Sequence, residues 1–369
     1  MRRKLLIPLA VLTALALAYP QLKSHLQATA VLKQVSGGPV PYALAISTTN
    51  AITTEDIELP NKTRARIYLP ENPVGALVIF HGVHHLGIDE PRLESFAAAL
   101  ATCGIQVLTP ELPHLKDYTV DQLSIKQIGE AATYFAQQTH QPVGIMGLSF
   151  AGGLALLAAA DPTYSPSIKF VVAIGSQDSM AHVTTYYRTS QADRPDHTTQ
   201  TLPAHEYGAL VSEYDHLEDF LPAQDLEAIR PVLRAHLYED KQAEAQALAR
   251  LTPAQKIEAT NLLNSTSDQT RTALQNSVAL HIEEANQLSP HSHITTLQTP
   301  VYLLHGEADN IIPASETLWL ASELPPNTLK AVLISPVLSH LDMQKQPTTR
   351  DQWNLIHFFA KIIRAAHKN

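Results

Sequence analysis

A serine flanked by glycines stands where a short apolar run of the chain gives way to a longer one. Residues 142–146 read Pro-Val-Gly-Ile-Met, the segment Gly147-Leu-Ser149-Phe-Ala151-Gly-Gly follows, and residues 154–160 are all apolar. The first run predicts a buried strand and the second predicts a helix, so Ser149 lies at the turn between them. A serine at such a turn projects its hydroxyl outward. The first amides of the helix have no partner of their own and can hold a developing negative charge, so this segment could supply a nucleophile.

Two further polar residues follow predicted strands later in the chain. Asp309 lies in an acidic turn after the apolar run 301–305, and His340 follows the apolar run 329–334. A serine hydroxyl is a poor nucleophile until a base removes its proton. An imidazole can act as that base, and a carboxylate can fix its tautomer. The order Ser149, Asp309, His340 therefore predicts a nucleophile, an acid and a base.

The chain order Ser-Asp-His, with each residue just beyond a strand, resembles the α/β-hydrolase superfamily. The resemblance covers most of residues 52–368, apart from a large insertion. It implies an α/β fold with a mostly parallel sheet covered by helices on both faces, and the activity of a serine hydrolase. The last glycine of the usual motif is Ala151 here, for which we expect a small shift of helix packing. The loop at His81 and the insertion also resemble the dienelactone-hydrolase-like and prolyl-oligopeptidase-like branches.

The same resemblance implies the remaining site residues. The oxyanion hole would use the amides of Phe150 and of Val83, which lies in the loop after an upstream strand. Asp178 is the alternative acid, because it comes just after the strand predicted over 168–174 and some members carry the acid there.

Three histidines close together raise the question of a metal site. His81, His84 and His85 fall in one loop, but no carboxylate or cysteine joins them at ligand spacing. We therefore expect neither a metal nor a cofactor. The one cysteine, Cys103, excludes an intramolecular disulfide and is expected to be a buried small hydrophobe.

A long segment between two predicted strands forms the insertion, over residues 178–295. Asp178 to Pro290 holds 17 acidic and 8 basic residues, which accounts for the whole net charge of −9. A nucleic-acid partner would need a basic face, so we expect none.

Apolar residues of the insertion from Leu274 to Leu288 recur at helical spacing. The position is where cap domains occur in the superfamily, so we predict a helical cap at 178–295 and a core formed by 52–177 and 296–369.

The N-terminus has the pattern of an export signal. Arg2-Arg3-Lys4 precedes the apolar stretch 5–18, which ends in Ala-Leu-Ala. As a helix this stretch spans roughly 20 Å, short of the ~30 Å hydrocarbon core of a bilayer, although extension to Leu22 nearly closes the gap. Residues 1–22 are therefore predicted to be either a cleaved signal peptide or a membrane anchor. Residues 23–51 are predicted to be a stalk, and the folded part is predicted to lie outside the cytoplasm, in the cell envelope or the extracellular space.

Three functional hypotheses follow. The first is a hydrolase of small carboxylic esters that proceeds through an acyl-enzyme at Ser149. The second is a peptidase or amidase with the same residues. The third is an envelope protein that uses the fold only to bind a ligand or partner, since a fold does not define a function. The sequence specifies neither the acyl chain nor the oligomeric state.

Overall fold

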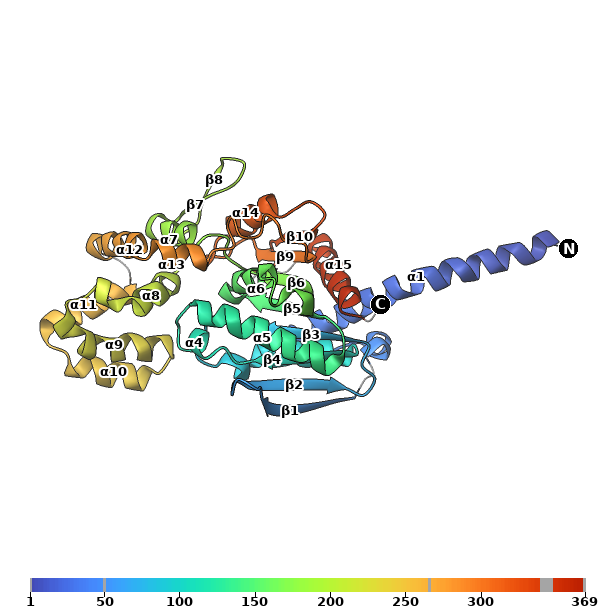
Figure 1. The fold of residues 1–369 in the computed structure, drawn as a ribbon, viewed down its shortest axis with the longest axis horizontal. Coiled ribbons are helices and arrows are strands. Elements are labelled where there is room, and N and C mark those ends of the chain that lie inside the picture. Colours follow the sequence, from blue (N-terminus) through green and yellow to red (C-terminus); the bar gives the residue numbers. More distant parts are fainter. Residues whose placement is uncertain (1, 49–50, 265–266, 339–347, 368–369) are drawn as a thin grey trace.

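Eight strands form one sheet at the centre of the molecule (Figure 1). The structure is a computed structural model that describes residues 2–48, 51–264, 267–338 and 348–367. The sheet order is β1-β2-β4-β3-β5-β6-β9-β10. Its strands are β1 (Ile52–Glu58), β2 (Arg64–Pro70), β3 (Gly75–Phe80), β4 (Ile105–Pro110), β5 (Val143–Leu148), β6 (Ile168–Ile174), β9 (Val301–Gly306) and β10 (Leu329–Ser335). β2 pairs antiparallel with β1 and β4, and all the other pairs are parallel.

Helices cover both faces of this sheet, as the sequence predicted. One buried apolar cluster joins the sheet to α5, α6 and α14, and a second joins its other face to α1, α3 and α15. The helices outside the insertion are α1 (Arg2–Val35), α2 (Tyr42–Ala45), α3 (Pro91–Thr102), α4 (Pro113–Lys116), α5 (Gln122–Thr139), α6 (Phe150–Ala160), α14 (Ser315–Glu323) and α15 (Thr349–Ala366). Parallel strands are buried on both faces in this arrangement, which explains why β3, β5 and β6 read as almost continuous apolar runs.

The segment between β6 and β9 is mainly helical and gathers at the end of the molecule away from the N-terminus (Figure 1). It contains α7 (Met180–Thr189), the hairpin β7 (Gln191–Asp193) and β8 (Thr199–Thr201), α8 (Glu206–Asp215), α9 (Ala223–Leu237), α10 (Lys241–Arg250), α11 (Pro253–Asn264), α12 (Asp268–Leu280) and α13 (Ile282–Gln287). The helical spacing from Leu274 to Leu288 predicted one helix there, but the backbone leaves helical geometry at His281. Because of this break the predicted apolar face is lost. Leu274 and Leu288 are buried, whereas Ile282 is 39% exposed.

The N-terminal helix differs most from the sequence-based prediction. A stalk was predicted from residue 23, but α1 continues to Val35 and packs against α3 and α15. Ser24, Gln27, Ala28 and Val31 are buried in this contact. Their spacing of three and four residues places them on one face of a helix, so this part of the chain belongs to the folded body. Towards its N-terminus α1 projects away from the sheet (Figure 1). Within the part of the chain that the structure describes, no helix is both long and apolar enough to cross a bilayer.

Candidate active site

Ser149 lies at a sharp turn between β5 and α6, in a backbone conformation that side chains rarely adopt. Its φ is 55° and its ψ is −136°. The Ser149 amide donates a hydrogen bond to the Ile174 carbonyl, at 2.8 Å. The Ser176 hydroxyl donates to the Ser149 carbonyl, at 3.0 Å. Positive φ at a non-glycine residue costs on the order of 1–3 kcal/mol and persists only where neighbours hold it. The last residue of β6 and the loop that follows it supply these two contacts.

Small residues make this turn possible. A Cβ at Gly147 would lie 2.2 Å from the Ala151 carbonyl oxygen, and one at Gly152 would lie 1.8 Å from the Ser176 Oγ. Neither position could hold a side chain without displacing backbone or a hydrogen-bonded hydroxyl. Ala151 stands where the usual motif has glycine. Its methyl group is fully buried, and α6 still begins at Phe150, directly after the serine.

The loop after β3 lies against this turn. A Cβ at Gly82 would be 3.0 Å from the Cβ of Ser149 and 3.3 Å from the Leu148 carbonyl oxygen. Val83 follows and is buried. Phe150 is the first residue of α6, where helix amides lack an intrahelical acceptor. The two segments that were predicted to supply the oxyanion hole, at Phe150 and Val83, therefore meet beside the serine.

Asp309 lies in the turn after β9 and is 1% exposed. Its Oδ1 accepts hydrogen bonds from the amides of Ile311, at 2.9 Å, and Ile312, at 3.0 Å. These bonds fix the carboxylate at the end of the strand. His340, the predicted base, lies outside the described residues.

Two buried histidines near the site have structural roles. The Leu112 amide donates to His81 Nε2 at 2.9 Å, so His81 Nδ1 carries the proton and donates to the Gly82 carbonyl at 2.7 Å. Burial lowers the pKa of His81 to about 4, which keeps this imidazole neutral. His305 contacts Thr317 at 2.7 Å and the Ile312 carbonyl at 2.8 Å, and it braces the turn that carries Asp309.

Comparison with solved structures identifies the architecture. An acylaminoacyl peptidase in complex with Z-Gly-Gly-Phe-chloromethyl ketone matches with a TM-score of 0.50 at 11% identity, over 87% of this chain and 42% of that chain. A putative lipase from Acinetobacter baumannii AYE matches with a TM-score of 0.45 at 15% identity, over 85% of this chain and 92% of that one. The chain has the α/β-hydrolase fold. No protein-family model and no curated protein matches the sequence.

Asp178, the predicted alternative acid, lies in surroundings that suit that role poorly. The residue is fully buried after β6, and its neighbours include Glu316 and Glu323 of α14. Burial, followed by the negative charges of these two carboxylates, raises the pKa of Asp178 to about 8. A carboxyl group that is mostly protonated at neutral pH cannot stabilise an imidazolium. Asp309, by contrast, is held by two backbone amides in the turn after β9.

The two histidines that follow His81 contact each other and a tyrosine. The rings of His84 and His85 stack at 4.5 Å, and the His85 amide donates to the Tyr118 hydroxyl at 3.3 Å. Among the described residues, the groups that bring three metal-ligating side chains together lie elsewhere, in and beside the insertion.

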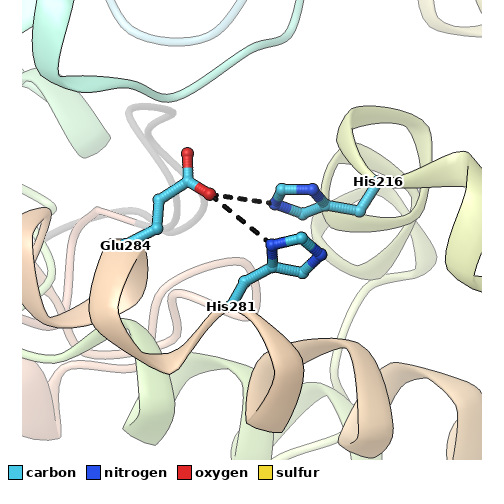
Figure 2. Close-up of side chains that lie close together, drawn as sticks. All are labelled: His216, His281 and Glu284. Atoms are coloured by element: carbon cyan, nitrogen blue, oxygen red, sulfur yellow. Dashed lines mark ion pairs between the residues drawn. The ribbon is translucent and has the colours of Figure 1, made fainter.

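One such group joins His216, His281 and Glu284 (Figure 2). Both rings face the Glu284 carboxylate, with His216 Nε2 at 3.9 Å and His281 Nδ1 at 3.7 Å. The rings stack at 3.9 Å with an angle of 14° between their planes. An imidazole binds a metal along its ring plane, so two nearly parallel rings cannot both point at one ion unless one of them turns. Asp219 also contacts His281, at 3.0 Å. The arrangement is that of an ion-pair cluster.

Tyrosines of the insertion lie near the candidate site. The sequence analysis did not predict them as site residues. The Tyr207 hydroxyl donates to the Val83 carbonyl at 2.8 Å. Tyr186 and Tyr187 of α7 are buried, and the nearby Asp309 carboxylate adds to the rise in their pKa caused by burial. Within the described residues neither of these two hydroxyls has a hydrogen-bond partner. No spacing rule relates these tyrosines to Ser149, because only the folding of the insertion brings them there.

Proposed function

We propose that the protein is a serine hydrolase that cleaves an acyl bond through Ser149, His340 and Asp309. The backbone of Ser149 supports this proposal most directly, because it places a strained serine at the start of a helix beside the Gly82–Val83 loop. His340 would take the hydroxyl proton as Ser149 Oγ attacks the carbonyl carbon, and would then give that proton to the leaving group. Water would release the acyl group by the reverse path. Asp309 would orient the imidazole and stabilise its charged form.

The amides of Phe150 and Val83 would hold the oxyanion of the tetrahedral intermediate. Donors of this kind act on charge that develops during the reaction, in a site shielded from water. Ser149 is 4% exposed and Val83 is buried, which supports a shielded site.

The substrate class that we propose is a carboxylic ester. Cleavage of an amide additionally requires protonation of an amine as it leaves. The solved structures that share the fold include a protein described as a lipase and one described as a peptidase, so the fold accommodates both chemistries. A panel of p-nitrophenyl esters of graded chain length, run beside aminoacyl anilides, separates the two substrate classes.

The insertion, residues 178–295, would act as a cap over this site. Its α8 reaches the oxyanion loop through the bond from Tyr207 to Val83, and the Leu237 carbonyl at the end of α9 accepts from the Tyr118 hydroxyl. Tyr186 and Tyr187 bring α7 near Asp309. A segment that contacts the oxyanion loop through α8 and approaches Asp309 through α7 can restrict the acyl or leaving group.

Labelling by a fluorophosphonate tests the function, because the reaction requires an activated serine. We expect the wild-type chain to be labelled at Ser149 and Ser149→Ala to remain unlabelled. Absence of labelling in a folded wild-type chain would favour the hypothesis of a non-catalytic binding protein.

For localisation we propose export, with residues 1–22 as a signal peptide or anchor. The basic residues Arg2 to Lys4 and the apolar stretch 5–18 support it. The buried contact of α1 begins at Ser24, so cleavage before that residue would leave the folded body intact. Fractionation of cells that express the full chain tests the proposal, and recovery of the uncleaved chain in the cytosol would contradict it.

A further inference from the structure

Five titratable side chains meet where the two ends of the insertion join the core. Asp178 and His182 lie at its beginning, between β6 and the first turn of α7, and His291 lies beyond α13 at its end. Glu316 and Glu323 come from the first and last turns of α14. Ligand atoms of Asp178, His182 and Glu316 lie within 4.8 Å of one another, and so do those of Asp178, His291 and Glu323. Asp178 is common to both groups.

Asp178 is buried at the centre of this cluster without a hydrogen bond to its carboxyl group from the described residues. It is 0% exposed, and neither carboxylate oxygen has a hydrogen-bond partner among the described residues. The nearest ion-pair atom is His291 Nδ1, at 3.4 Å. A buried carboxylate without hydrogen bonds is costly unless a cation compensates it.

The neighbours of Asp178 add negative charge. Glu316 is also buried. Its Oε2 accepts from the amides of Asp178 and Ser179, both at 2.9 Å, which leaves Oε1 facing His182 Nδ1 at 3.4 Å. Glu323 Oε1 lies 2.5 Å from His291 Nδ1. Among the described residues, no lysine or arginine forms an ion pair with any of the three carboxylates. Within the part of the chain that the structure describes, the ion pairs of these carboxylates are thus with two imidazoles.

We propose that this cluster is a binding site for a divalent transition-metal ion of the Zn²⁺ class. Asp178, His182 and Glu316 would be its protein ligands, and His291 would supply the fourth. Mixed imidazole and carboxylate ligands suit Zn²⁺ and its neighbours, whereas Ca²⁺ and Mg²⁺ prefer oxygen ligands alone. The rings of His182 and His291 are half-exposed, whereas the carboxylates of Asp178 and Glu316 are buried behind them.

Such an ion would have a structural role. It would cross-link the first and last segments of the insertion to α14, which follows the turn that carries Asp309. Metal binding would then hold the base of the insertion in place without contact to the reacting atoms. The proposal does not depend on the serine-hydrolase function.

Calorimetric titration with ZnCl₂ tests the site on the full-length chain, after metal is removed by chelation and dialysis. We expect wild-type protein to bind Zn²⁺ and to melt at a higher temperature in its presence. Asp178→Asn should weaken binding by about 100-fold or more, because it removes the shared ligand. It should still fold, because the amide has nearly the same size as the carboxyl group and carries no charge in the buried position. His182→Ala changes a half-exposed side chain and should also weaken binding strongly while the chain remains folded.

The cluster of Figure 2 provides the matched control. His281→Ala removes a histidine from the other candidate group and should leave Zn²⁺ affinity unchanged. Absorption of the Co²⁺-loaded protein gives an independent readout, and we expect a ligand-field spectrum that Asp178→Asn abolishes. The proposal fails if wild-type protein binds no Zn²⁺, which would mean that protons alone compensate the carboxylates. It also fails if only His281→Ala weakens binding, or if Asp178→Asn and His182→Ala bind as the wild type does.

Discussion

Gly82 lies so close to Ser149 that a Cβ at position 82 would stand 3.0 Å from the Cβ of the serine. The loop after β3 and the turn after β5 are thus in contact at the proposed nucleophile. Since Val83 directly follows Gly82, this contact also sets where the Val83 amide lies relative to Ser149. The absence of a side chain at Gly82 therefore determines the geometry of the proposed oxyanion hole.

Gly82→Ala should lower kcat by about 10- to 100-fold while the protein remains folded. The added methyl group must push the loop back by a few tenths of an ångström, and small misplacements of catalytic groups have effects of this size. Ester hydrolysis and circular dichroism measure the two quantities. Gly38→Ala is the matched control, because its added Cβ meets nothing closer than 3.5 Å. Equal activity of the two variants would mean that the loop does not take part in catalysis.

Substitution of Ser149 should separate activity from stability. Ser149→Ala and Ser149→Gly should both lose about 10⁴-fold or more in kcat. Glycine adopts the positive φ of 55° at this position without strain, whereas alanine is strained there, as serine is. We therefore expect the free energy of unfolding, measured in urea, to be about 1 kcal/mol higher for Ser149→Gly than for Ser149→Ala. An alanine variant that retained a tenth of the activity would exclude Ser149 as the nucleophile.

Replacement of the two candidate acids should have unequal effects. Asp309→Asn should reduce kcat by about 10³- to 10⁴-fold, because the amide cannot stabilise an imidazolium. Asp178→Asn should change kcat by less than about 10-fold in the same assay, since Asp178 lies among Glu316, Glu323 and two imidazoles. The reverse order of effects would move the acid to the end of β6.

The buried neutral His81 should make the fold sensitive to mild acid. Its pKa is lowered from 6.5 to about 4, so the unfolded chain takes up the proton first as the pH falls. The free energy of unfolding should therefore decrease between about pH 6.5 and pH 4, by roughly 2–3 kcal/mol from this group.

Urea unfolding across this pH range, on the wild type and His81→Asn, measures the contribution. The variant should be less stable than the wild type at pH 7, because the substitution removes the hydrogen bond from the Leu112 amide to His81 Nε2. Its free energy of unfolding should also depend less on pH. His197→Asn, at an exposed position, should retain the full dependence. Identical slopes for His81→Asn and the wild type would show that His81 titrates normally.

Much of this architecture could be predicted from the sequence because it rests on local patterns. The apolar runs that became β3, β5, β6 and β9 are buried on both faces, so their composition alone indicates central strands. The turn at Ser149 could be predicted for the same reason, since Gly147 and Gly152 are required wherever a helix passes this close to a strand.

Other features depend on contacts between distant parts of the chain. The helix through Ser24, Gln27 and Val31 was missed because glycine and proline further along suggested an irregular stalk, while the packing partners of α1 lie in α3 and α15. The break at His281 was missed because a regular apolar spacing continues across it. The cluster around Asp178 joins segments more than a hundred residues apart, so no spacing rule could assemble it.

The contact between Tyr207 and Val83 provides a test of the proposed cap. Tyr207→Phe removes the hydrogen bond from α8 to the Val83 carbonyl of the oxyanion loop, at 2.8 Å, and leaves the apolar ring in place. We expect altered KM values and a changed preference for acyl chain length, by about 3- to 10-fold between short and long esters, because a net hydrogen bond contributes about 1 kcal/mol. Fluorophosphonate labelling of Ser149 should persist. Tyr238→Phe is the control, since that hydroxyl bonds to Asp117 at an exposed position. If Tyr207→Phe and Tyr238→Phe both retain the wild-type ester profile, α8 does not shape the substrate site, and the insertion serves stability or partner contact instead.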